Sequence, residues 1–302
     1  YSDEDLLRRE MGRFSKRDAD AYVRFARDVS RQCRFIKPML MRTPPDPTSF
    51  KPKDLGELIY LFKRLYSLGE QTIYDTIRFY TMSVAEYLEE YFETDIVKAT
   101  LSGSGIIGTG LGPYSPGTAY VLLHHYMGEV DGSIGSWGFA RGGMGSIANA
   151  LADAFKDHDG ELLTDAEVSQ IIVKRGRAKG VVLSNGDEYY AKNIVSNLDV
   201  KRTYQKLFDP KDLSEKVLKQ VDNFKIRGSS GKLNIALDGV PEFPALGKNN
   251  PLMYADMHFI DSLERMERAY DDWKNGRWSR DPYTDVLIPT MTDPTMSPPG
   301  KH

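Results

Sequence analysis

Cysteine is nearly absent from this chain of 302 residues, in which Cys33 is the only one. A single thiol excludes a disulphide framework and a cysteine-based metal site within one chain. This composition favours a reducing, intracellular setting, and we expect a cytoplasmic one, with a mitochondrial or membrane-peripheral location left open. No signal peptide is visible, and no apolar run approaches the roughly 18 residues needed to span a bilayer.

The chain also lacks an excess of positive charge. The chain has 40 basic and 43 acidic residues and a net charge of −3, whereas a nucleic-acid-binding protein needs a basic balance or a basic face. The sequence contains neither a GxSxG elbow nor an HExxH motif, so serine hydrolase and zinc peptidase chemistry have no support. We therefore expect no nucleic-acid partner and no metal site.

Helical periodicity dominates residues 2–127. Ser15 begins a predicted helix that runs to about Met41, Lys53 begins another, and Ser83 with Glu86 forms a capping box. Aromatic side chains crowd this half and predict either a helix–helix core or an apolar tunnel for a long hydrophobic substrate. They are Tyr60, Tyr66, Tyr74, Phe79, Tyr80, Tyr87, Tyr91 and Phe92.

The stretch 141–197 organises the rest of the chain. It begins with a glycine run, after which Ser146 is expected to cap a helix whose apolar residues recur at helical spacing. Three strand-like runs follow, at 167–174, 179–184 and 192–196. They are separated by Arg177-Ala178 and by Asn185-Gly186, the second of which is a strong tight-turn signal.

One glycine motif is misleading. Residues 103–108 match GxGxxG literally, but a dinucleotide fingerprint needs a strand before it and an uninterrupted helix after it. Here Asp95 to Leu101 is typical of a helix, and Pro113 and Pro116 prevent a long helix afterwards. We therefore reject a phosphate-binding role for this segment.

Later segments predict further elements. Residues 116–127 predict a short helix that contains His124 and His125. Adjacent residues on a helix lie about 100° apart, so the two histidines cannot both face one site. A buried, hydrogen-bonded histidine is therefore expected ahead of a catalytic one. The other expected elements are helices at 199–208, 213–224 and 261–273 and strand character at 225–237.

Several short signatures in order resemble the flavin-dependent amine oxidase and phytoene desaturase superfamily. The glycine turn Gly142-Gly143-Met144, Val168, the hairpin Gly180-Val181 to Gly186 and the strand end Val195-Ser196-Asn197 carry the resemblance. It extends upstream to 112–125 and downstream to 232–237 and 298–302, and so covers most of the chain.

The resemblance implies an α+β fold: an incomplete α/β FAD-binding part and a largely helical substrate cap. The expected parts are a mostly helical substrate domain at 1–135, a partial FAD-binding domain at 136–200, and the remainder of the substrate domain at 201–302. The implied site residues are, for the cofactor, Arg141, Gly142, Gly143, Met144, Val168, Ser196 and Asn197; for the substrate, Tyr120, His124, His125 and Trp137; and for catalysis Lys232, which as a lysine at a strand end is otherwise a solvated charge.

The family also has parts that this sequence does not show. A complete member opens with a strand–GxGxxG–helix unit that holds the FAD pyrophosphate, so we expect an interior piece that binds FAD weakly or not at all. Faces that the other segments cover would then favour self-association.

Three functions stay open for the whole protein. They are a flavin-dependent dehydrogenase or desaturase acting on a hydrophobic small molecule, a redox-neutral carotenoid isomerase-like enzyme, and a non-catalytic interaction module on a flavoprotein scaffold. The flavin would carry out the redox chemistry in the first of these, which agrees with the lack of an acid–base dyad in the sequence.

Overall fold

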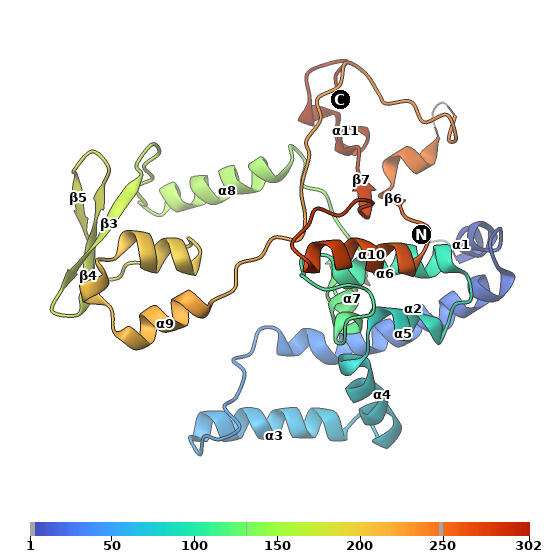
Figure 1. Cartoon of the computed structure of the whole chain (residues 1–302), viewed down its shortest axis with the longest axis horizontal. Helices are drawn as coiled ribbons and strands as arrows, with labels where there is room; N and C mark the ends of the chain where they lie inside the picture. The colour runs from blue at the N-terminus through green and yellow to red at the C-terminus, as the bar shows by residue number, and fades with distance from the viewer. Residues whose placement is uncertain (1–3, 131, 248–249) are drawn as a thin grey trace. The chain divides into compact units, whose positions relative to one another are not determined.

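The computed structural model describes residues 4–130, 132–247 and 250–302. The chain forms two compact units: unit 1 consists of residues 1–143 and 229–302, and unit 2 consists of residues 144–228. Helices and short antiparallel sheets occur together, in agreement with the predicted α+β class (Figure 1). The assignment of 1–135, 136–200 and 201–302 to substrate and flavin domains stays a prediction.

The first part of unit 1 is helical, as its periodicity predicts. Ser15 accepts the backbone N–H of Asp18 at the start of α2, and Ser83 and Glu86 form the predicted capping box of α5. Helix α2 ends at Ile36, five residues before the predicted Met41, because Pro38 lacks an N–H and ends the helix in a 3-10 turn. The elements are α1 (Glu4–Met11), α2 (Lys16–Ile36), η1 (Lys37–Met39), α3 (Pro52–Tyr66), α4 (Glu70–Thr81), α5 (Val84–Glu89), α6 (Asp95–Ile106) and α7 (Thr118–Tyr126).

An aromatic core holds α2, α4, α5 and α7 together. Phe25 is fully buried, and its ring lies 5.4 Å from Phe92, 5.6 Å from Tyr91 and 6.0 Å from Tyr126. Phe79 and Tyr87 are also buried, with ring centroids 4.8 Å apart. The packing interpretation therefore holds for these rings. Tyr66 and Tyr74 differ, since both are largely exposed.

The literal GxGxxG lies at the end of helix α6, so a helix precedes its glycines. A Cβ on Gly105 would lie 2.8 Å from the side chain of Val84, and one on Gly103 would lie 2.6 Å from the hydroxyl of Tyr283. These glycines therefore permit close packing of α5 and of the segment after α10 against α6.

The C-terminal part of unit 1 packs on the same helix. Met266 of α10 is buried with Ala99 and Ile260, and Ser102 donates to its sulfur at 3.0 Å. The predicted helix at 261–273 is confirmed. The elements are the hairpin β1 (Glu129–Val130) and β2 (Ser133–Ile134), then η4 (Pro251–Tyr254), β6 (Met257–Phe259), α10 (Leu263–Lys274), β7 (Thr284–Val286), α11 (Pro289–Thr292) and η5 (Pro294–Met296).

Unit 2 contains a three-stranded antiparallel sheet. Its strands are β3 (Val168–Lys174), β4 (Arg177–Leu183) and β5 (Glu188–Tyr190), in the order β3-β4-β5. The first turn is Arg175-Gly176 rather than the predicted Arg177-Ala178, because both residues have positive φ, at 53° and 71°, as a tight two-residue hairpin requires. The Asn185-Gly186 turn is confirmed, with Gly186 at φ 94°.

The predicted third strand at 192–196 is wrong. The strand that pairs with β4 is β5, directly after the Asn185-Gly186 turn, and residues 192–196 form no strand. Val195 is 91% exposed. A strand needs a neighbouring strand for its backbone groups, and 192–196 has none among the described residues.

The remaining elements of unit 2 are helical. They are α8 (Met144–Asp157), the π-helical turn η2 (Arg202–Leu207), η3 (Pro210–Asp212) and α9 (Glu215–Asn223). All except η3, which lies between two expected helices, occur in the expected helical regions. Helix α8 begins at Met144, so Ser146 lies inside its first turn and is not the predicted cap. Among the described residues, none of the helices combines the length and the apolar character needed to cross a membrane.

Candidate functional site

The turn Arg141-Gly142-Gly143 ends the first segment of unit 1. Gly142 and Gly143 have φ values of 82° and 75°, a region that favours glycine. The N–H of Gly142 donates to Oδ2 of Asp293 at 2.5 Å, and the N–H of Gly143 donates to the carbonyl of Ala140 at 2.9 Å. Both glycine N–H groups are therefore used within the protein, so a cofactor phosphate would not find them free.

Asp293 is the centre of this arrangement. Its Oδ1 accepts the backbone N–H of Thr295 at 3.0 Å and the Thr295 hydroxyl at 2.6 Å, while its Oδ2 accepts from Gly142. The side chain is 8% exposed. Hydrogen bonds from Thr295 and Gly142, with the nearby Arg141 charge, hold the pKa of Asp293 below its usual range. A carboxylate therefore holds the glycine turn in place.

The sequence prediction missed Asp293. Asp293 is not among the residues singled out from the sequence, although an Asp directly before Pro294 is typical of a residue that caps a turn. That pattern predicts the bond to Thr295. It does not predict the bond to Gly142, since the two residues lie 151 positions apart.

The guanidinium of Arg141 is the charged group that this turn offers to a ligand. Arg141 is exposed, and its fork of five donors suits a phosphate or carboxylate. Gly142 is also exposed and has no Cβ, so a planar group can approach the backbone closely. Arg141, Gly142 and Gly143 thus form a small cationic surface in unit 1.

The other expected cofactor residues lie in unit 2. Met144 is 75% exposed at the start of α8, and Val168 begins β3, paired with Leu183. The hydroxyl of Ser196 lies 2.9 Å from that of Thr203, and Asn197 is exposed. Of these, Ser196 lines a cavity of about 260 Å³, together with Ile171, Ala178, Ile194, Leu198, Val200, Thr203, Tyr204 and Phe208.

Two ring pairs on α7 contain the expected substrate residues. Tyr120 and His124 lie 4.6 Å apart, and His125 stacks on Trp137 at 5.8 Å with nearly parallel planes. Trp137 also donates its Nε1–H to the carbonyl of His125 at 3.0 Å. The four residues therefore form two separate pairs, as expected from adjacent positions on a helix.

The two histidines differ from the expected buried pair. His125 is half-buried, and its Nδ1 lies 3.2 Å from the carbonyl of Val121, whereas His124 is exposed at its edge of the helix. Partial removal from water, with the nearby His125, lowers the pKa of His124. The hydrogen-bonded role therefore applies to His125 and is wrong for His124.

Lys232 lies in an exposed, extended segment rather than in the predicted strand. Two backbone hydrogen bonds join Leu237 to His302, at 2.7 and 3.0 Å, and residues 225–237 form no strand. The strand expected at 225–237 is therefore wrong for the described residues of that range. The reason is again the lack of a neighbouring strand.

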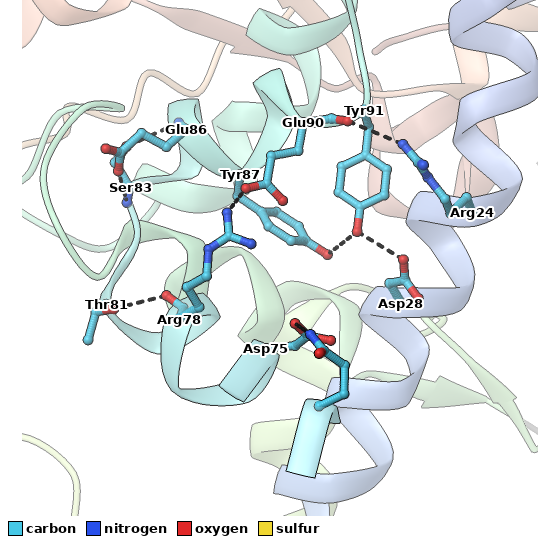
Figure 2. Close-up of polar contacts among 11 residues, drawn as sticks. Arg24, Asp28, Asp75, Arg78, Thr81, Ser83, Glu86, Tyr87, Glu90 and Tyr91 are labelled. Carbon is cyan, nitrogen blue, oxygen red and sulfur yellow. Dashed lines mark hydrogen bonds and ion pairs between the residues drawn. The ribbon is translucent and has the colours of Figure 1, made fainter. Parts of the chain in front are cut away.

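An acidic hollow of about 460 Å³ also lies in unit 1. It is lined by Arg78, Met82, Glu86, Glu89 and Glu90. Figure 2 shows Arg78 paired with Glu90, and Tyr91 donating to Asp28 at 2.9 Å beside it. Three carboxylates and one guanidinium would repel a pyrophosphate, so this hollow does not suit a dinucleotide. No cluster of metal-ligating side chains occurs within the described ranges of the chain.

The expected cofactor residues fall into two groups, one in each unit. Unit 1 has the Arg141 cation beside a glycine turn, and unit 2 has a mostly apolar cavity with Ser196 at its lining. The cavity, of about 260 Å³, is the size of a single ring system and is well below the size of FAD.

Known proteins resemble this chain over most of its length. The profile of flavin containing amine oxidoreductases matches residues 67–302. The chain is 30% identical to a mouse (Mus musculus) protein, pyridine nucleotide-disulfide oxidoreductase domain-containing protein 2, over 97% of this chain and 53% of that protein. It is 30% identical to a prolycopene isomerase of Daucus carota, over 84% and 38%, and 25% identical to a lycopene-forming phytoene desaturase of Pseudescherichia vulneris, over 72% and 41%.

Proposed function

Because this chain belongs to the flavin containing amine oxidoreductase family, we propose that it is part of a flavin-dependent oxidoreductase that removes a hydride from a C–H bond of an apolar substrate. The chain spans about half the length of the curated relatives it matches, so this activity is that of the whole protein. Bound FAD would supply the hydride acceptor. The residues of this chain bind and orient the reactants and exclude water.

One observation carries the proposal: the bond from Gly142 to Asp293. It joins the glycine turn of the family signature to the segment before Pro298-Pro299-Gly300 and keeps the turn in its left-handed conformation. The turn is therefore formed before any ligand arrives, which removes part of the entropy loss on binding. Arg141 would then hold an anionic part of the cofactor. Ser196 and Asn197 of unit 2 are proposed as cofactor residues from the family signature alone.

The rings of α7 are the proposed substrate surface. Tyr120 and Trp137 present aromatic faces, and His124 and His125 add polar edges. A hydrophobic small molecule would pack on such faces. Lys232 is the proposed lysine beside the flavin, and its test is the rate of flavin reduction in a Lys232→Met variant of the whole protein.

A redox-neutral isomerase is the second candidate. It is favoured by the similarity to the prolycopene isomerase of Daucus carota, which covers 84% of this chain. Net consumption of an electron acceptor by the whole protein separates the two, because an isomerase returns its electrons to the product. A non-catalytic interaction module would show neither flavin binding nor turnover.

We expect the isolated chain to bind FAD weakly. The glycine turn offers the Arg141 cation, and unit 2 offers a small cavity. So few contacts cannot offset the entropy that so large a ligand loses on binding. The test is the visible absorbance of the purified chain after it is mixed with FAD and passed through a desalting column. We expect a colourless protein, and stoichiometric flavin bands would contradict weak binding.

The role of Arg141 has a separate test. Fluorescence titration of FAD should give a weaker complex for Arg141→Gln, by about 5- to 10-fold for a lost charged hydrogen bond. Arg177→Gln, at another exposed arginine on β4, is the matched control and should titrate like wild type. Equal titration of all three proteins would contradict the placement of FAD at this turn.

We further propose that α8 drives self-association of the chain. Its apolar stripe of Met144, Ile147, Leu151 and Phe155 is 44–75% exposed, and contiguous apolar patches of this kind mark contact surfaces. Analytical ultracentrifugation should show a concentration-dependent oligomer that the double variant Leu151→Glu/Phe155→Glu dissociates. An oligomer that survives the double substitution would exclude α8 as the contact.

A further inference from the structure

Helix α3 has an unusual distribution of side chains for a surface helix. Leu55, Ile59, Phe62 and Tyr66 recur at i, i+4, i+7 and i+11 and form one stripe, the α3 stripe. Their side chains are 40, 55, 67 and 75% exposed, and the rings of Phe62 and Tyr66 stack at 6.1 Å. The α3 stripe therefore faces water, where a soluble helix usually presents polar residues.

Polar side chains of α3 form hydrogen bonds to other segments of unit 1. Arg64 donates to the carbonyls of Arg34 and Phe35 at the end of α2, at 2.8 and 2.9 Å. Glu57 accepts two hydrogen bonds from Arg42, at 2.8 and 2.9 Å, and Asp54 accepts the N–H of Asp46. Both acidic groups of the helix are thus engaged by other parts of unit 1.

The charges beside the α3 stripe are positive. Lys51 and Lys63 flank the stripe in the helical register and are exposed, and residues 50–67 contain four basic and two acidic residues. The two acidic residues are the half-buried Asp54 and Glu57. The exposed side of this helix therefore combines large apolar side chains with the exposed Lys51 and Lys63, in a helix that is too short and too charged to cross a bilayer.

This combination points to one kind of occupant. An in-plane amphipathic helix buries its Phe and Leu side chains at the boundary of headgroups and acyl chains, and its lysines contact anionic headgroups. We infer that the α3 stripe is a docking surface for an anionic lipid membrane. This inference is independent of the proposed flavin chemistry, since it uses no residue of the candidate site.

Helix α8 provides an internal comparison. It also exposes an apolar stripe, but its charged residues are Asp153, Lys156 and Asp157, so its balance is negative. Anionic lipid would repel that surface. The two helices therefore separate the effect of exposed apolar area from the effect of charge beside it.

Vesicle sedimentation of the full chain tests the inference. The probes are vesicles of phosphatidylcholine alone and of phosphatidylcholine mixed with an equal amount of phosphatidylglycerol. We expect wild type to sediment with the anionic vesicles. Ile59→Glu/Phe62→Glu should lose at least about 10-fold in partitioning, because two apolar side chains that the membrane would bury are replaced by negative charges, which anionic lipid repels. The control Trp278→Glu, at a side chain that is 94% exposed and lies outside α3 and α8, should sediment like wild type.

A second variant keeps the α3 stripe intact. Lys51→Gln/Lys63→Gln should lower partitioning to the anionic vesicles by about fivefold for each lysine and leave the neutral vesicles unaffected. Far-UV circular dichroism verifies that each variant is folded. The inference is overturned if wild type stays in the supernatant with both vesicles, or if Ile59→Glu/Phe62→Glu partitions like wild type. The inference is also overturned if wild type binds no vesicles but forms a dimer that Ile59→Glu/Phe62→Glu dissociates. The α3 stripe then binds a second copy of the chain.

Discussion

The N–H of Gly142 donates to Oδ2 of Asp293 at 2.5 Å, although 151 positions separate the two residues. The same carboxylate caps Thr295 with its other oxygen, at 2.6 and 3.0 Å. One buried charged group thus organises its own turn and a second, distant one. Charged hydrogen bonds of this kind are roughly twice as strong as neutral ones.

Asp293→Asn tests this arrangement. An asparagine can keep its oxygen on Thr295, but it then presents an NH₂ group to the N–H of Gly142, so two donors face each other. We expect a loss of about 1.5–3 kcal/mol of unfolding free energy and faster amide exchange at 140–146, measured by hydrogen–deuterium exchange. These readouts need no flavin, so they distinguish a failure of this bond from a failure of the proposed function.

Asp209→Asn is the matched control for that variant. Asp209 also precedes a proline and accepts the N–H of the residue two positions later, at 3.1 Å, but it lies in unit 2. Its substitution should leave exchange at 140–146 unchanged. Wild-type exchange in Asp293→Asn would contradict the role of Asp293 in holding the glycine turn.

Gly105→Ala should destabilise the contact between α5 and α6. The new Cβ would lie 2.8 Å from three carbon atoms of Val84, and overpacking of this kind costs roughly 1–3 kcal/mol. Gly56→Ala is the control, because no atom lies within 4 Å of its Cβ and it should gain about 0.5–1 kcal/mol. Urea unfolding measures both. Val84→Ala should rescue Gly105→Ala only in part, because it removes the two Cγ atoms of Val84 and keeps the Cβ, which is also 2.8 Å from the new Cβ.

Cys33 should resist labelling while the protein is folded. Its side chain is fully buried, and burial raises the pKa of the thiol to about 11, so at about pH 8 the reactive thiolate is a very small fraction. We expect labelling by Ellman's reagent only at the rate at which the α2–α7 core opens, and fast labelling in denaturant. Cys33→Ala should abolish the signal, and rapid reaction of the native chain would contradict the packing.

The stability of unit 1 should fall in mild acid. The pKa of His124 is lower in the folded state than its ordinary value, so the unfolded chain binds protons more readily. Stability is therefore complete above about pH 6.5 and decreases as the pH falls below it. His124→Gln should flatten this decrease in urea unfolding curves, whereas His158→Gln, on an exposed position of unit 2, should leave it unchanged.

Local signals predicted the helices well. Ser15 and the Ser83–Glu86 pair mark helix starts that the structure confirms, because a cap depends on residues three positions apart. The strands were predicted less well. The runs at 168–174 and 177–183 pair with each other through a short turn, while 192–196 and 225–237 have suitable residues and no neighbouring strand among the described ones.

The candidate site shows the same division. The glycine turn 141–143 could be identified because positive φ requires glycine. The exposure of Lys232 agrees with its alternative interpretation as a solvated charge. The pairing of His125 with Trp137 and the bond from Asp293 could not be identified, because each depends on where another segment of the chain lies.

The sequence by itself determined the helical half, the turns at glycine, the absence of disulphides and the resemblance to flavin enzymes, since each depends on composition or on residues close in the chain. Only the tertiary structure decided that Asp293 holds Gly142, that the GxGxxG glycines serve packing, and that α3 turns its apolar side to solvent. The physical reason is that hydrophobic periodicity shows that a helix has an apolar face. Whether that face is covered depends on the other segments that fold around it.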